Sequence, residues 1–132
     1  MKSLTFRLKQ GDLLKEEIER RTKDVPAGVL LSVVGGLDNI VFRLPKGTAE
    51  RHPMLRQDGP FEIVSGTGTI SPDGCHIHMS VADTSGQVLG GHLKDGCVVY
   101  MTAEVVIGIL DDVSYTREVD AETGFAELKA AQ

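Results

Sequence analysis

Tight-turn signals divide the second half of the chain into short runs of strand-forming residues. Ser71-Pro72-Asp73-Gly74 is a strong turn sequence, and Asp83-Thr84-Ser85-Gly86 and Asp95-Gly96 repeat the signal further along. The segment after the last turn, Val98 to Leu110, is the longest β-rich run of the chain. Strands joined by such short turns pair antiparallel, so this half of the sequence predicts an antiparallel sheet.

The first half adds one helix and further strands. Asp12 is the expected N-cap of a helix over 13–22, which has a short apolar stripe. Gly35-Gly36 is expected to bend the chain between two strands, and the polar segment 46–58 reads as a long connection. The other predicted strands are 3–8, 29–34, 40–44, 61–70 and 114–119, and the tail beyond them is polar. These elements predict one domain, residues 1–132, of the α/β (α+β) class: an antiparallel-dominated sheet of about six or seven strands with one early helix packed on it.

Composition argues against several classes of function. The chain carries 14 Lys and Arg against 19 Asp and Glu, for a net charge of −5, and aromatic residues make up 5% with no Trp. Few cations and few stacking rings argue against a large nucleic-acid footprint. No apolar run is long enough for a signal peptide or a membrane span, so we expect a cytoplasmic protein without membrane contact. In that reducing compartment Cys75 and Cys97 are expected to be small buried side chains rather than a disulfide.

Three of the four histidines fall in one hairpin-like unit. His76 and His78 are two residues apart, so in a strand both point to the same face. The chain turns near Gly86 and returns, and His92 follows the pair Gly90-Gly91. Three neutral imidazoles suit zinc or nickel better than magnesium or calcium, and they leave a fourth position open. The pattern therefore indicates a divalent metal, zinc, on His76, His78 and His92; the competing interpretation is a solvated strand face.

Other polar residues are weaker candidates. Glu104 interrupts an apolar strand, and it is a candidate fourth ligand, ligand-orienting residue or general base if it shares the histidine face. Glu62 is either solvated or part of a subunit interface. His52 precedes a proline in a polar loop and is expected at the surface. No phosphate-binding glycine loop, nucleophile elbow or Cys-x-x-Cys motif is present, so no catalytic residue is assigned.

The sequence resembles the plants-and-prokaryotes-conserved (PPC) domain family, also catalogued as a domain of unknown function. Three segments, in this order and spacing, carry the resemblance: Gly11-Asp12-Leu13-Leu14, Gly59-Pro60-Phe61-Glu62-Ile63-Val64-Ser65-Gly66, and Gly86-Gln87-Val88-Leu89-Gly90-Gly91-His92-Leu93. It extends from about Phe6 to Tyr115 and implies a compact antiparallel sheet with a helix against it, assembled as a homotrimer. The histidine pattern resembles that of the stand-alone prokaryotic members.

The resemblance also implies a DNA-binding description that this sequence supports poorly. In plant members an AT-hook, Arg-Gly-Arg-Pro, enters the minor groove, and the domain itself mediates self-association and partner binding. This chain has no Arg-Gly-Arg-Pro, and Pro60 stands where the plant pattern has arginine. We therefore expect a homotrimeric interaction or regulatory module with a bound metal, a protein or small-molecule partner, and DNA binding that is weak if it occurs. The alternative is a metal-dependent enzyme or small-ligand-binding protein that uses the histidine cluster.

Overall fold

The computed structural model describes residues 1–132 and contains one helix and eight strands. The elements in chain order are β1 (Lys2–Lys9), α1 (Leu14–Arg21), β2 (Gly28–Arg43), β3 (Met54–Ser71), β4 (Gly74–Ala82), β5 (Val88–Leu93), β6 (Val99–Ile109), β7 (Ser114–Val119) and β8 (Ala126–Ala131). The predicted class, an antiparallel-dominated sheet with one early helix, is confirmed. The helix is too short to cross a membrane, and the structure contains no other.

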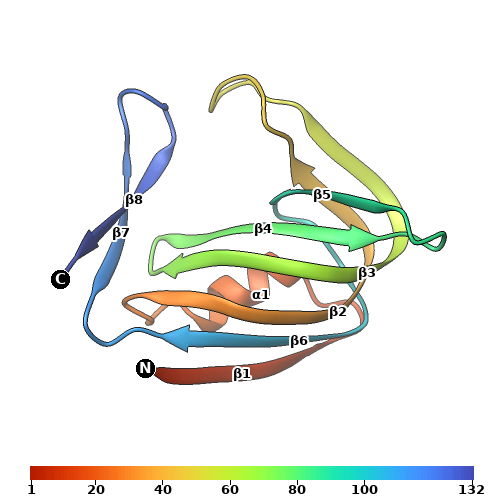
Figure 1. The fold of residues 1–132 in the computed structure, drawn as a ribbon, viewed down its shortest axis with the longest axis horizontal. Helices are drawn as coiled ribbons and strands as arrows, with labels where there is room; N and C mark the ends of the chain where they lie inside the picture. Colours follow the sequence, from red (N-terminus) through yellow and green to blue (C-terminus); the bar gives the residue numbers. More distant parts are fainter.

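Six strands form one antiparallel sheet in the order β1-β6-β2-β3-β4-β5. Figure 1 shows β1, β6, β2, β3 and β4 as neighbouring ribbons, with α1 behind them. The end of β2 also pairs with β5, through Phe42↔Leu93 and Arg43↔His92. This extra pairing joins β2, β3, β4 and β5 into a ring at one end of the sheet, and it brings Arg43 beside the last of the three histidines.

The strands β2 and β3 are longer than the sequence predicts. Instead of bending the chain between two strands, Gly35-Gly36 lies within the continuous strand β2, where the register with β6 shifts. A Cβ on Gly35 would lie 2.0 Å from the carbonyl oxygen of Thr102, so only glycine allows this close approach. The partner β3 begins at Met54, so the second half of the segment 46–58, predicted to be a connection, is strand. Glycine at a bulge lets a strand continue where the pattern alone suggests a break.

The core lies between the helix and the inner face of the sheet. The helix buries Leu14 and Ile18 against the strands. Asp12 is not its N-cap: the helix begins after Leu13 without a side-chain cap, and the carboxylate of Asp12 instead accepts a hydrogen bond from the backbone N–H of Lys9 at 2.9 Å. Asp12 therefore stabilises the turn after β1, which is a common alternative use of aspartate near a helix start.

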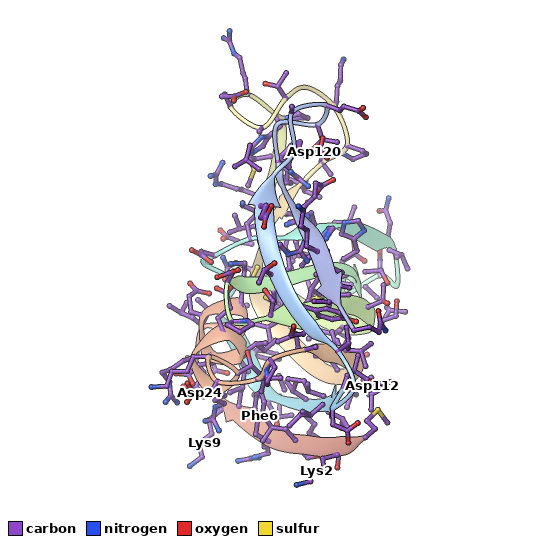
Figure 2. All side chains as sticks on the ribbon, turned by 90° about the vertical axis from the view of Figure 1, so that its left-hand side faces the viewer. Lys2, Phe6, Lys9, Asp24, Asp112 and Asp120 are labelled. Carbon is purple, nitrogen blue, oxygen red and sulfur yellow. The ribbon has the colours of Figure 1, made fainter.

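The end of the chain forms a second, two-stranded sheet: the predicted strand 114–119 is β7, and its partner β8 lies in the tail that the sequence predicts only as polar. The strands β7 and β8 pair as an antiparallel hairpin, and Figure 2 shows it rising from near Asp112 to Asp120 at its tip. Its base is attached through Arg117, whose backbone N–H donates to Asp73 at 3.0 Å and whose guanidinium donates to Thr69 at 2.9 Å. The hairpin thus stands beside the edge of the sheet from which the histidines project.

Candidate metal centre

The three histidines that the sequence places in one unit lie together in the structure. His78 on β4 is paired directly with His92 on β5, and His76 is two residues before His78 on the same face. One ring nitrogen of each lies within 4.8 Å of the others, and the ring centroids are 4.8 to 5.4 Å apart. The predicted cluster is therefore present as a geometric group.

The strand alternation explains why these rings point away from the core. Ile77, Met79 and Val81 alternate with the histidines on β4, and all three are buried. The two glycines before His92 lie very close to the backbone and side chains of the neighbouring strands. A Cβ on Gly91 would lie 2.8 Å from Cβ of Phe42, and one on Gly90 would lie 2.9 Å from the carbonyl oxygen of Met79. The glycine pair therefore lets β5 lie close to β2 and β4.

The spacing of the nitrogens suits a tetrahedral ion. Nε2 of His76 lies 3.1 Å from Nε2 of His78, a hydrogen bond in which one N–H donates and the other ring nitrogen accepts. Two nitrogens bound to one tetrahedral zinc at about 2.0–2.1 Å would lie about 3.3 Å apart. This pair is therefore already at coordination spacing, and a metal would replace the shared proton. Closing the longest separation in the cluster requires at most about 1.5 Å of side-chain movement.

Burial and neighbouring cations hold two of the rings neutral. Burial, followed by the charge of Arg43, lowers the pKa of His92 to about 3. Burial, followed by the neighbouring His78, also lowers the pKa of His76. A neutral imidazole is the form that binds a metal, so protons compete less for these two rings than for an ordinary histidine. A solvated strand face does not have this property.

Arg43 and Phe125 complete the surroundings of the cluster, and sequence reasoning missed both. Nη2 of Arg43 donates to Nδ1 of His92 at 3.1 Å, and the guanidinium lies over the ring of Phe125 at 4.4 Å from its centroid. A guanidinium only donates, so the neutral ring of His92 carries its proton on Nε2 in this arrangement. The available signal was Phe125 as the one aromatic residue after Tyr115, but its position depends on the hairpin.

A cleft opens beside the histidines. Its volume is about 610 Å³, and it is bounded by the β2–β3 loop, by β3, β4 and β5, and by the tip of the β7–β8 hairpin. The lining includes His78, His92 and Arg43, together with hydroxyl side chains of β3 and β4. Two of these hydroxyls, on Ser65 and Ser80, share a hydrogen bond of 2.9 Å. The face that carries the histidines is thus accessible to a small molecule.

The other candidates lie elsewhere. Glu104 is on β6, which β2 and β3 separate from β4, so about three strand spacings, roughly 14 Å, lie between it and the histidine strand. It is not part of the cluster: Glu104 is exposed on the outer face of β6, and its apolar neighbours Ala103 and Val105 are buried on the inner face. Glu62 is exposed on β3. His52 donates from Nδ1 to the carbonyl oxygen of Thr48 within its loop.

The cysteines do not supply a fourth ligand. Both are unpaired, and Cys97 is fully buried. Burial raises the pKa of Cys75 to about 12 and that of Cys97 to about 11, so both remain protonated thiols. The Cys75 thiol also lies toward the helix, whose Glu19 accepts a hydrogen bond from the Cys75 backbone N–H at 2.9 Å. Their role is packing, as the sequence analysis expects.

Residues 1–111 match the model of the Plants and Prokaryotes Conserved (PCC) domain, the family that the sequence resembles. Among curated proteins, the chain is 39% identical over 130 residues to the bifunctional protein GlmU of Synechococcus sp. (strain JA-2-3B'a(2-13)). The match covers 97% of this chain but only 20% of that protein. The chain therefore spans about a fifth of the length of the curated relative that it matches.

Solved structures share the complete fold. A protein of Salmonella cholerae-suis superposes with a TM-score of 0.87 at 29% identity, covering 98% of this chain and 93% of its own. AF0104 of Archaeoglobus fulgidus, described as a metal-containing protein, has a TM-score of 0.82 at 27% identity, covering 96% and 92%. A Ralstonia eutropha JMP134 protein for which DNA binding is proposed has a TM-score of 0.82 at 21% identity, covering 95% and 89%, and this likeness concerns the fold alone.

Proposed function

Because the chain belongs to the Plants and Prokaryotes Conserved (PCC) domain family, we propose that it is a homotrimeric interaction or regulatory module that holds one zinc ion on His76, His78 and His92. The observation that carries the metal assignment is the convergence of three imidazoles at coordination spacing on one face of the sheet. Nitrogen ligands favour zinc over magnesium or calcium, which prefer oxygen. The metal-containing description of AF0104 supports the same assignment.

An exposed apolar surface supports self-association. Met101 is 67% exposed, Val64 is 56% exposed and Val34 is 52% exposed. Val34 and Val64 lie on the neighbouring strands β2 and β3, between the paired residues Leu30↔Gly68 and Gly36↔Glu62. Val34 and Met101 also line one hollow of about 610 Å³ on the outer face. Adjacent exposed apolar side chains of this size are typical of a protein–protein contact.

The backbone of Met101 strengthens this assignment. Met101 has a φ of 64°, and it is the one residue other than glycine in the left-handed region. Such a conformation costs free energy and is found mostly where function requires it. A methionine that is 67% exposed and lines the same hollow as Val34 is well placed to insert into a neighbouring subunit.

We propose that DNA binding is weak. The chain carries 19 acidic and 14 basic residues, and this net charge of −5 repels the phosphates of a duplex. The proposal also includes a cytoplasmic location, which the two unpaired thiols support, since reducing conditions keep thiols free.

A second candidate function, a small-ligand-binding protein or metal-dependent enzyme, draws on the cleft. A zinc ion with three histidine ligands has one position left for water or a ligand, and the cleft of about 610 Å³ gives access to it. Zinc supplies a polarised water when it is bound. No side chain at an appropriate distance is assigned as the general base, so ligand binding is the better supported of these alternatives.

Metal analysis of untagged protein tests the proposed centre. We expect about one zinc per chain in the wild type after zinc supplementation and loss of most of it in His78→Ala, because three ligands become two. The fold should persist in His78→Ala, since that side chain is exposed. His52→Ala is the matched control, because it removes a histidine outside the cluster. A full metal content in His78→Ala, or a wild type without metal, would show the assignment to be wrong.

A further inference from the structure

The charge of the cleft beside the histidines is opposite to that of the chain. Arg43 and Lys46 line it, and no carboxylate does, although the chain has 19 acidic residues and 14 basic ones. Its volume of about 610 Å³ lies within the range of small-molecule sites. A concave site with fixed positive charge raises the local concentration of anions. The cleft therefore has the electrostatics of an anion site.

Arg43 is held in place without a counterion. Its guanidinium stacks on Phe125 and donates from Nη2 to His92. Neither Arg43 nor Lys46 takes part in any of the ion pairs of the structure. Stacking occupies the face of a guanidinium and leaves the N–H groups at its edge available. An oriented arginine with free donors and no carboxylate partner is suited to bind an anionic ligand.

A metal on the histidines would release Arg43 further. His92 must offer a ring lone pair to the metal, either from Nδ1 or from Nε2 after its proton has moved to Nδ1. In both cases Nδ1 no longer accepts the hydrogen bond that Arg43 now donates. The guanidinium and the metal are then two neighbouring cations, and their repulsion is relieved most directly by an anion between them.

The shape of the donor set favours a carboxylate over a phosphate. The guanidinium edge matches the paired oxygens of a carboxylate or of a phosphate, so the other donors of the cleft decide between the two. Phosphate sites commonly add backbone N–H groups of a helix N-terminus or a glycine-rich nest. Here the one helix lies behind the sheet (Figure 1). Most of the residues that line the cleft belong to the strands β2, β3, β4 and β5. The hydroxyls of Ser65, Thr67 and Ser80 are available for the other end of a ligand.

We infer that the cleft binds a small organic carboxylate between the guanidinium of Arg43 and the open position of the metal. Phe125 acts as the platform that orients Arg43, so the β7–β8 hairpin contributes directly to the site. The contact to the metal rests on the proposed zinc centre, whereas the contact to Arg43 does not.

Cobalt-substituted, untagged protein gives a spectroscopic test. Acetate, succinate and benzoate are titrated and followed by the visible d–d spectrum of Co²⁺ and by calorimetry, with succinamide as the uncharged probe and inorganic phosphate as the competing anion. We expect at least one carboxylate to change the spectrum and to bind more tightly than phosphate, and succinamide not to bind. Failure of all three carboxylates, or tighter binding of phosphate, would overturn the inference.

Two variants assign the contact to Arg43. Arg43→Lys keeps the charge but loses the fork and the stacking, so carboxylate affinity should fall about tenfold or more while the cobalt content stays at the wild-type level. Arg56→Lys changes an exposed arginine on β3 outside the cleft and should bind as the wild type does. Equal affinity in Arg43→Lys and the wild type would overturn the role of Arg43.

The metal-free protein separates the two proposals. If cobalt and zinc do not bind, the proposed metal centre is wrong, and succinate is then titrated into metal-free protein with the backbone amide signals of 90–92 as the NMR readout. Shifts that saturate in the wild type but not in Arg43→Lys support the carboxylate site alone. If cobalt binds and no carboxylate does, the metal centre stands and the carboxylate site is refuted.

Discussion

Acid should destabilise the metal-free protein through His92. Burial and the charge of Arg43 lower the pKa of this ring to about 3 in the folded state, whereas an unfolded histidine has a pKa of about 6.5. Between these two values the unfolded chain binds a proton at His92 that the folded chain does not bind. The free energy of unfolding therefore falls as the pH drops from about 6.5 toward about 3, and it is insensitive to this group above that range.

The size of the effect follows from the two pKa values. When the pH is lowered from about 7.5 to about 5, it ends about 1.5 units below the pKa of the unfolded ring. Each of these units lowers the free energy of unfolding by about 1.4 kcal/mol. The loss is about 2 kcal/mol, and screening by solvent at a partly exposed ring reduces it to about 1–2 kcal/mol. The result depends little on the folded pKa, as long as this lies below about 4.

Urea unfolding of the protein with a metal chelator measures this loss, at one fixed protein concentration because self-association links stability to concentration. His92→Gln keeps an oxygen that accepts from Arg43 but cannot titrate, so its stability should change by about 1–2 kcal/mol less than that of the wild type over the same pH range. His52→Gln removes a histidine from the β2–β3 loop and should retain the acid-induced loss. NMR titration of the ring protons gives the pKa of His92 directly.

Two results would contradict the proposed link between the low pKa of His92 and acid destabilisation. One is an equal acid-induced loss of stability in the wild type and in His92→Gln. The other is a His92 ring that titrates near 6.5 in the metal-free folded protein, because the ring would then be neither desolvated nor held neutral by Arg43.

Three further predictions concern packing, assembly and partners. Gly91→Ala should lower the free energy of unfolding by about 1–3 kcal/mol in urea titrations. The added Cβ would lie 2.8 Å from Cβ of Phe42 and 2.9 Å from the carbonyl oxygen of Arg43, and an unchanged unfolding midpoint would contradict the prediction. Val64→Arg should convert trimers to monomers of 14.2 kDa in light scattering, whereas Val119→Arg, at a valine of β7 that is more exposed than Val64, should not; a monomeric wild type would refute the trimer. Any DNA complex should dissociate as salt rises toward physiological concentration, and a salt-resistant, sequence-specific complex would disprove the expectation of weak binding.

Local sequence signals determined much of the sheet. The turns at 71–74, 83–86 and 95–96 lie between observed strands, because proline, aspartate and glycine favour tight turns in any context. The alternation around His78 correctly predicts which side chains of β4 enter the core, since the period of a strand is two. The prediction fails at Gly35-Gly36 and in the tail at 126–131, where pairing with a neighbouring strand decides the structure. The bulge at Gly35-Gly36 forms against β6, and the polar strand β8 forms by pairing with β7.

The local sequence is enough to place two histidines on one strand face and to return a third beside them, because strand period and turn chemistry act over a few residues. The surroundings of the cluster depend on long-range contacts. Arg43 reaches His92 through the pairing of β2 with β5, 49 residues apart in the chain, and Phe125 reaches Arg43 through the β7–β8 hairpin. Burial and charge at the site, and therefore the low pKa of His92, depend on these distant segments. Glu104 lies outside the site because the order of strands in a sheet is set by long-range packing and not by the local pattern of the sequence.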